Sequence, residues 1–322
     1  MPETADTNIF KPINQGYNSV FGVGRLSIGL VVPIENYANG PVPQLDRHIE
    51  RVQLAETLGF SAVWLRDVPF NVPSFGDAGQ THDPFVYLGL LAGETNRIAI
   101  GVASIILPLR HPAHVSKAAA TADVLSGGRL ILGVASGDRP DEYPAVNIPF
   151  SSRGERFRSS FEYIRKVSGH TPAFENAHGS LDGNMDMLPK PTSGRLPLLI
   201  TGGSQQTANW IAQHGDGWIL YPRPAASQAL VIADWKQRVE AAGRSNLPVM
   251  EPLYVDLTED ADSPPKPIHL GFRLGMNHLR DYLKTRAEIG VNHVALNLRF
   301  NQTDIETTLK RLADELLHDF EK

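Results

Sequence analysis

The chain of 322 residues contains no cysteine. It therefore has no disulfide bonds, no thiolate nucleophile and no cysteine-ligated metal site, which is consistent with a reducing compartment such as the cytoplasm. The sequence also lacks an HExxH motif and any cluster of carboxylates and histidines at ligand spacing. A metal centre is therefore not expected.

Runs of basic residues and long apolar runs are also absent. The net charge is −5 and the basic residues are scattered, so nothing in the composition favours nucleic-acid binding. No apolar run is long enough to cross a bilayer. The first residues, MPETADTNIF, have neither the basic nor the apolar region of a signal peptide. We therefore expect a cytoplasmic protein that binds neither nucleic acid nor a membrane.

The most informative stretch runs from Arg97 to Arg139. It begins with an apolar run of strand length, Ile98 to Val102, that is followed by prolines. Pro112 then starts a helix, whose apolar residues recur every three or four positions from Val115 onward. A glycine pair ends the helix and Leu130 to Val134 follows, apolar at consecutive positions. Such a run is typical of a parallel strand that is buried on both faces.

Strand and helix patterns alternate through the whole chain, about eight of each, as a (β/α)₈ barrel requires. The first strand is predicted over Leu26 to Val32, after an N-terminal arm of residues 1–24. No GxGxxG turn follows it, which disfavours the alternative, a doubly wound open sheet. We predict one α/β domain over residues 1–322, a TIM barrel with long loop insertions at the C-terminal rim. The loops His170 to Arg195 and Thr258 to Gly271 are expected to be able to close over the site.

In such a barrel the functional side chains lie at the C-terminal ends of the strands. Arg66 and Asp67 follow the predicted second strand, where a structural role would more often use an apolar or small residue. We expect both to be catalytic residues that face the ligand and polarise or orient it, the alternative being a surface ion pair. Trp218 and Tyr221 bracket another strand end and can stack on a planar ligand, although Trp218 is equally suited to the core.

An anion site is predicted at Gly202-Gly203-Ser204, before a helix expected over Gln205 to His214. Glycines allow a ligand to approach the backbone closely, and a helix start offers unpaired N–H groups. The hydroxyls of Ser204 and Thr207 would lie on the same face of the first turn. The alternative is an ordinary capped helix.

Two other kinds of site are disfavoured. His111 precedes a proline at a helix start, and we interpret it as a structural residue rather than a catalytic one. No lysine at a strand end is available for a Schiff base, and no acid–base pair stands out, which argues against an aldolase or isomerase barrel.

The segments IILPLRHP (105–112) and ADVLSGGRLILGVASGD (122–138) resemble the luciferase-like flavin monooxygenase family, and in particular its branch of uncharacterised oxidoreductases. The resemblance extends from Arg25 to Phe320. It implies an FMN-dependent monooxygenase that uses reduced flavin and O₂ on a small organic substrate, with a separate flavin reductase and a homodimeric assembly. The alternatives on this fold are a coenzyme F420-dependent hydride-transfer enzyme and a flavin-binding protein without turnover.

The resemblance also assigns cofactor-binding residues. It implies a non-proline cis peptide at Ala103-Ser104, against which the isoalloxazine packs. It implies that the flavin phosphate lies at Gly202-Gly203-Ser204 and Thr207. Ser136 stands where luciferase has a basic residue near the phosphate, so Arg139 or Arg223 is left as the charge partner.

The chain departs from the luciferases at the end of its second strand. The luciferases carry a histidine pair there, whereas this sequence has Val68 and Pro69. The luciferase catalytic base is therefore not carried over, and light emission from aldehydes is not expected.

Overall fold

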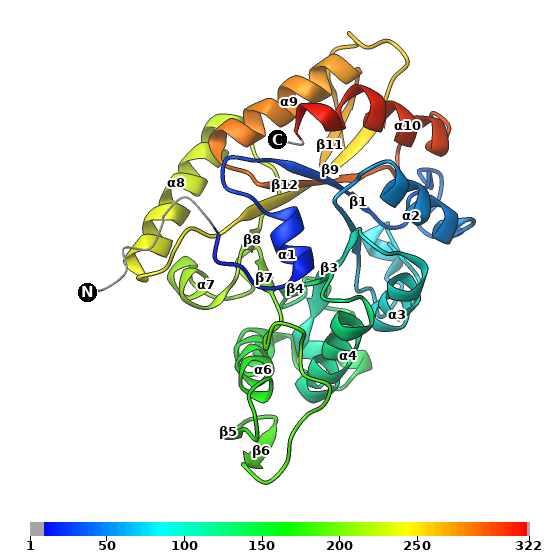
Figure 1. Cartoon of the computed structure of the whole chain (residues 1–322). Coiled ribbons are helices and arrows are strands. Elements are labelled where there is room, and N and C mark those ends of the chain that lie inside the picture. The colour runs from blue at the N-terminus through cyan, green and yellow to red at the C-terminus, as the bar shows by residue number, and fades with distance from the viewer. Residues whose placement is uncertain (1–9, 321–322) are drawn as a thin grey trace.

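The computed structural model describes residues 10–320, in which eight parallel strands form a closed barrel (Figure 1). Neighbouring strands follow in the order β9-β12-β1-β2-β3-β4-β7-β8, and β8 pairs with β9 to close the ring. The barrel strands are β1 (Ser27–Val31), β2 (Ala62–Leu65), β3 (Ala99–Ile106), β4 (Leu130–Ala135), β7 (Leu198–Thr201), β8 (Trp218–Ile219), β9 (Val249–Leu257) and β12 (His293–Asn297). The predicted pairing of the two central strands is confirmed as β3 beside β4.

Each barrel strand is followed by a helix on the outside of the ring, so the (β/α)₈ prediction is confirmed. These helices are α2 (His48–Thr57), α3 (Pro84–Glu94), α4 (Pro112–Leu125), α6 (Arg153–Val167), α7 (Ala208–His214), α8 (Ala225–Ala241), α9 (Met276–Ile289) and α10 (Ile305–Glu315), with a short α5 (Glu142–Ala145) before α6. The start of α4 shows how the sequence sets where a helix begins. The imidazole of His111 accepts a hydrogen bond from the Ala113 N–H, which caps the helix, and Pro112 occupies its first position. The structural interpretation of His111 is therefore confirmed.

The described part of the N-terminal arm fills the end of the barrel at which the strands begin. It contains a short helix, α1 (Gln15–Val20), which lies inside the ring of strands in Figure 1. Tyr17 and Phe21 pack there against the side chains that fill the barrel interior, among them Trp64 and Ile131. The Tyr17 hydroxyl donates to the backbone carbonyl of Asp216 at 2.8 Å. The arm was predicted as irregular chain, and its first nine residues lie outside the described residues.

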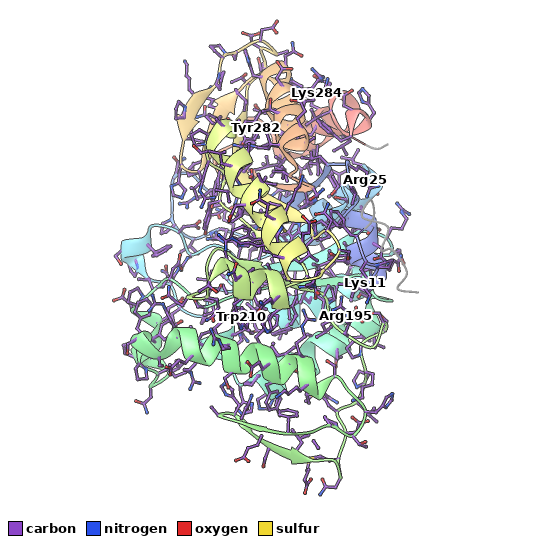
Figure 2. The ribbon with its side chains drawn as sticks, turned by 90° about the vertical axis from the view of Figure 1, so that its left-hand side faces the viewer. Lys11, Arg25, Arg195, Trp210, Tyr282 and Lys284 are labelled. Carbon is purple, nitrogen blue, oxygen red and sulfur yellow. The ribbon has the colours of Figure 1, made fainter. Side chains whose placement is uncertain are left out.

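The two long loops lie in different places. Residues 170–195 contain a hairpin of β5 (Ala173–Asn176) and β6 (Gly179–Asp182) that extends beyond the outer helix α6 (Figures 1 and 2). It therefore does not close over the mouth of the barrel. Residues 258–271 lead instead through β10 (Lys266–Ile268) into β11 (Gly271–Leu274), which pairs with the C-terminal half of β9. The tip of this second hairpin reaches the C-terminal rim. Within the described residues, no helix is both long and apolar enough to span a membrane.

A buried histidine occupies the barrel interior. The His293 Nε2 accepts a hydrogen bond from the Trp64 indole N–H at 2.8 Å, and its Nδ1 lies 2.7 Å from the Ser27 hydroxyl. Because Nε2 accepts, the neutral tautomer carries its proton on Nδ1. The imidazole is fully buried, and burial lowers its pKa from 6.5 to about 3. The folded barrel therefore holds His293 in the uncharged form.

Acidification should destabilise the barrel through this histidine. The unfolded chain binds a proton on His293 below pH 6.5 while the folded chain does so only near pH 3, so stability present above pH 6.5 is lost as the pH falls. Between pH 7 and pH 5 we expect a loss of about 2 kcal/mol in the free energy of unfolding. Urea unfolding at both pH values measures it.

The matched control for this prediction is His170, whose side chain is 92% exposed. His293→Gln should remove about 2 kcal/mol of the pH dependence, whereas replacement of the exposed His170 by glutamine should have a much smaller effect. If His293→Gln does not fold, the imidazole resonances of the wild-type protein provide the answer. Titration of His293 near pH 6.5 would contradict the prediction.

Candidate active site

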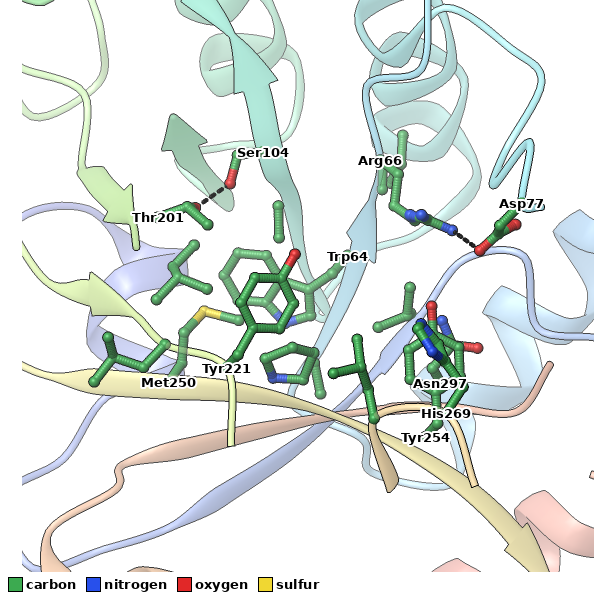
Figure 3. Close-up of a pocket in the computed structure, with 18 of the residues that line it drawn as sticks. Trp64, Arg66, Asp77, Ser104, Thr201, Tyr221, Met250, Tyr254, His269 and Asn297 are labelled. Carbon is green, nitrogen blue, oxygen red and sulfur yellow. Dashed lines mark hydrogen bonds and ion pairs between the residues drawn. The ribbon is translucent and has the colours of Figure 1, made fainter. Parts of the chain in front are cut away.

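Two adjoining pockets, which share part of their lining, open at the C-terminal ends of the barrel strands. Figure 3 shows the inner one. The inner pocket has a volume of about 180 Å³ and is mainly apolar; besides the shared wall it is lined by Val31, Trp64, Asp77, Met250, Pro252, Tyr254, His269, Leu270, Ala295 and Asn297. The polar pocket has a volume of about 300 Å³ and is lined by Asp67, Ser136, Gly137, Asp138, Arg139, Gly202, Ser204 and Gln205. The wall that both pockets share consists of Arg66, Phe75, Ala103, Ser104, Thr201 and Tyr221.

The pockets bring together most of the residues that were predicted as site residues. Those that line one or both pockets are Arg66, Asp67, Ala103, Ser104, Ser136, Gly202 and Ser204. Three others, Gly203, Thr207 and Trp218, line neither pocket. Each strand end contributes because the carboxyl ends of parallel strands meet at the same rim of a barrel.

A non-proline cis peptide joins Ala103 and Ser104, as the family resemblance implied. It lies in β3, at the boundary between the two pockets. The Ser104 hydroxyl is hydrogen-bonded to the hydroxyl of Thr201 at the end of β7 (Figure 3). The boundary therefore presents backbone and small hydroxyl groups, which leaves room for a flat ligand.

The segment after β7 differs from its prediction. The helix expected from Gln205 begins at Ala208, because Thr207 is its N-cap and accepts the Trp210 N–H at 3.2 Å. Ser204 and Gln205 instead adopt left-handed backbone conformations in a turn. The expectation that Ser204 and Thr207 share the first turn of a helix is therefore wrong. The Ser204 hydroxyl donates to the Thr201 carbonyl at 2.7 Å, so its proton is already used.

The two aromatic residues at the end of β8 have different surroundings. The Trp218 ring is buried, lies 4.8 Å from the Trp235 ring, and donates its N–H to the Gly202 carbonyl at 2.7 Å. It therefore supports the Gly202 turn from within the core instead of stacking in a pocket. Tyr221 is half exposed and lies on the wall shared by both pockets (Figure 3).

Arg139 is the buried cation of the polar pocket. Its Nη1 donates to no acceptor within residues 10–320, and its Nη2 makes one long hydrogen bond of 3.2 Å to the Asp77 carbonyl. The guanidinium lies 4.2 Å from the ring of Phe75. A buried guanidinium with an unused donor favours an anionic ligand, since leaving it unpaired is costly.

The nearby carboxyl of Glu142 does not neutralise Arg139 fully. Glu142 is completely buried, and burial raises the pKa of its carboxyl to about 7, although Arg139 acts in the opposite direction. A large share of Glu142 is therefore protonated at neutral pH. The other candidate charge partner, Arg223, lies outside the barrel, where it donates to Gln228 and lines a separate groove. Arg139 is thus the cation positioned for an anion in the polar pocket.

Gly137 keeps the backbone beside Arg139 accessible. Its φ is +76°, a left-handed conformation that favours glycine. A Cβ at this position would lie 2.8 Å from both the Ile106 side chain and the Tyr143 hydroxyl. The loop after β4 therefore passes tightly between these side chains and still exposes Ser136 to the pocket.

A second ionic cluster lies at the inner pocket. The Asp77 carboxylate accepts from Arg66 Nη1 at 2.8 Å and pairs with Arg299 Nη1 at 3.0 Å (Figure 3). Burial alone would raise the pKa of Asp77, but the two guanidiniums and the Gly79 N–H hold it below its ordinary value. The loop of residues 71–79 is thereby tied to the ends of β2 and β12.

Asp67 pairs with a different guanidinium, that of Arg110. Its carboxylate accepts from Arg110 Nε at 3.0 Å, from Arg110 Nη2 at 2.7 Å and from the Ile106 N–H at 3.0 Å. Its side chain is 1% exposed. These contacts hold the chain just after the cis peptide, and the role of Asp67 in orienting a ligand stays a prediction.

Several residues of the site were not predicted from the sequence, among them Phe75, Asp77, Tyr254 and His269. Phe75 and Asp77 lie in a loop whose only signal was its glycine and proline content. Tyr254 lies in the middle of a long strand, where alternation along β9 indicates an inward-facing residue. Among the described residues, no group of three or more histidine, aspartate or glutamate side chains is arranged to hold a metal ion.

The sequence matches the family described as luciferase-like monooxygenase over residues 26–295. The chain belongs to this family. An uncharacterised protein of Mycobacterium tuberculosis is 31% identical over 227 residues, which cover 65% of this chain and 79% of that protein.

Relatives with named activities differ in their chemistry. The F420-dependent hydroxymycolic acid dehydrogenase of M. tuberculosis is 28% identical to this luciferase-like chain, over 67% of this chain and 58% of that protein. The 4-hydroxyprotoasukamycin monooxygenase of Streptomyces nodosus is 26% identical, over 68% of this chain and 59% of that protein. These relatives therefore include both an F420-dependent dehydrogenase and a monooxygenase.

Solved structures confirm the fold. An F420-dependent secondary alcohol dehydrogenase superimposes with a TM-score of 0.75 and 17% identity, covering 92% of this chain and 99% of that one. The oxygenating constituent of 3,6-diketocamphane monooxygenase from Pseudomonas putida, in complex with FMN, has a TM-score of 0.73 and 12% identity, with the same coverage. At these identities the likeness establishes the shared barrel.

Replacement of Asp67 should destabilise the rim. Asp67→Asn keeps the shape but puts an amide N–H₂ against the donors of Arg110, and we expect the free energy of unfolding to fall by about 2 kcal/mol. Asp83→Asn is the matched control, because Asp83 pairs with the same Arg110 nitrogen at 2.9 Å but is 42% exposed. Asparagine also preserves the helix cap at position 83, so a loss below about 1 kcal/mol is expected. Equal losses in the two variants, measured by urea unfolding, would contradict this view of Asp67.

Proposed function

We propose that this chain is an FMN-dependent monooxygenase that uses reduced flavin and O₂ to oxidise a small organic substrate. The observation that carries the proposal is the pair of pockets on either side of Ala103-Ser104. One pocket is polar and holds the buried guanidinium of Arg139, whose Nη1 has no acceptor among residues 10–320. The other is mainly apolar and extends into the barrel. A molecule with a phosphate at one end and a flat ring at the other matches this division.

The residues of the polar pocket fit the phosphate of such a cofactor. Arg139 would supply a charged donor with an unused N–H, and the turn at Gly202 would supply backbone without a side chain. Ser136 lines the same space. The ring would lie against Ala103-Ser104, with the substrate beside it in the inner pocket.

The cofactor supplies the redox chemistry when it is bound, and the chain provides binding, orientation and exclusion of water. The apolar walls of the inner pocket and the two segments above it, residues 71–79 and the tip of the β10–β11 hairpin, serve the last purpose. We further propose that reduced flavin comes from a separate reductase and that the protein acts as a homodimer, as the family resemblance implies. We also propose that it is cytoplasmic, with which the absence of cysteine is consistent.

A coenzyme F420-dependent hydride transfer is the second candidate. It is favoured by the M. tuberculosis relative and by the F420-dependent alcohol dehydrogenase with the same fold. F420 also carries a phosphate, so the polar pocket suits either cofactor. The two cofactors must therefore be distinguished by their measured affinities and by whether the reaction requires O₂.

Separate titrations with FMN, reduced FMN and F420 should reveal one preferred cofactor. We expect reduced FMN to bind at least about tenfold more tightly than F420, corresponding to about 1.4 kcal/mol. Protein-dependent product formation should then require O₂. Tighter binding of F420, with oxygen-independent hydride transfer, would replace the FMN proposal with the second candidate. If none of the three binds, the proposed function fails.

Arg139→Met should weaken FMN binding by about ten- to a hundredfold, because one hydrogen bond to a charged group contributes about 1.5–3 kcal/mol. Riboflavin lacks the phosphate and should lose little affinity. Ser204→Ala should have a smaller effect, since its hydroxyl proton is bonded to the Thr201 carbonyl. Fluorescence titration of both flavins measures these changes.

The matched control is Arg223→Met, which removes the same charge from the separate outer groove. It should leave the affinity for FMN within about twofold of wild type, a difference below about 0.5 kcal/mol. Equal loss of FMN and riboflavin in Arg139→Met would show that Arg139 does not hold the phosphate.

A further inference from the structure

We propose that the substrate of the inner pocket is an organic anion: an apolar molecule with one carboxylate, which is held by Arg66. The proposal rests on the proposed function, in which the cofactor occupies the polar pocket and the substrate lies in the inner one. It is carried by the balance of charge and the unused donors at Arg66.

The charges around the inner pocket do not cancel. Two guanidiniums, Arg66 and Arg299, share the single carboxylate of Asp77. Oδ2 of Asp77 contacts both guanidiniums, and Oδ1 accepts a hydrogen bond from the Gly79 N–H at 2.7 Å. The cluster therefore carries one uncompensated positive charge, and the carboxylate has no strong acceptor left for another cation.

The unused donors of this cluster that line the inner pocket belong to Arg66, because the unused Nε of Arg299 is buried and Arg299 lines neither pocket. Nη2 of Arg299 donates hydrogen bonds to the backbone carbonyls of Gly76 and Gly40, so this nitrogen is already used. Arg66 uses only Nη1, and its Nε and Nη2 donate to no acceptor in the part of the chain that the structure describes. Its side chain is 20% exposed and lines both pockets. Nε and Nη2 together form one edge of the guanidinium, which matches the two oxygens of a carboxylate.

The rest of the inner pocket suits an apolar body. Its walls include Trp64, Met250, Pro252 and Ala295, and Figure 3 shows Trp64 and Met250 near its floor. Arg66 and Asp77 carry the charges among the described residues that line it, with His269 at its exposed edge. A ligand carboxylate would therefore meet the excess positive charge and no free carboxylate to repel it. An apolar carboxylic acid satisfies both parts of the pocket.

The test compares carboxylates with their neutral amides. The full chain, loaded with its preferred cofactor, is titrated by calorimetry with octanoate, octanamide, phenylacetate and phenylacetamide. We expect at least one carboxylate to bind about tenfold or more tightly than its amide, as one charged hydrogen-bonded contact predicts. If neither carboxylate is preferred over its amide, the proposal is overturned.

Variants then assign the preference to one side chain. Arg66→Met should abolish the preference for the carboxylate while changing the affinity for the amide by less than about twofold, and Arg66→Lys should restore part of it as a point charge without the fork. Arg299→Met is the matched control, because it also removes a partner of Asp77 but leaves the free edge of Arg66 intact. It should reduce carboxylate affinity less than Arg66→Met does.

Three outcomes separate this proposal from the proposed function. If the cofactor binds but carboxylates and amides bind alike, the proposed function stands and the anionic substrate is rejected. If Arg66→Met weakens the cofactor as much as it weakens the carboxylate, Arg66 serves the cofactor and the proposal is again rejected. If no cofactor binds yet the carboxylate preference depends on Arg66, the anion site stands and the proposed function fails.

Discussion

The shape of this site depends on one buried residue, Asp77. Its carboxylate accepts from Arg66 after β2 and pairs with Arg299 after β12, and its backbone carbonyl accepts from Arg139 after β4. Three strand ends and the loop of residues 71–79 thus meet at a single residue. Because the charges are withdrawn from water, these contacts are stronger than the same pairs on a surface, and losing the shared partner would leave guanidiniums unpaired.

The packing of the barrel explains why its interior is open at the C-terminal ends of the strands. At the opposite end, the N-terminal arm inserts Tyr17 and Phe21 beneath the interior side chains. The interior is then filled up to Trp64, which is held in place by its bond to His293. Above Trp64 the inward-facing residues no longer fill the ring, so space remains between the strand ends and the segments that cover them.

Much of this architecture was accessible from the sequence. The strands β3 and β4 are apolar at consecutive positions, and their connecting helix carries both a proline start and a glycine stop, so local pattern and tertiary packing agree. The start of α7 was misplaced because Gln205 and Gln206 are compatible with a helix and the capping role of Thr207 depends on actual backbone geometry. The contacts of Asp77 could not be predicted, because Arg139 and Arg299 lie far away in the sequence and only the closed barrel brings their strand ends to the loop of residues 71–79. Trp218 was ambiguous because its contact with Trp235 depends on how the next helix packs against the strand.

Leu270, at the tip of the β10–β11 hairpin, has one further consequence. It lines the inner pocket on one side and, on the other, the outer groove that contains Arg223, which has a volume of about 540 Å³. Leu270 therefore lies between the two spaces. A smaller residue at this position would widen the inner pocket toward the outer groove, so that longer molecules fit. The length of the ligand would then change without any alteration to the barrel strands.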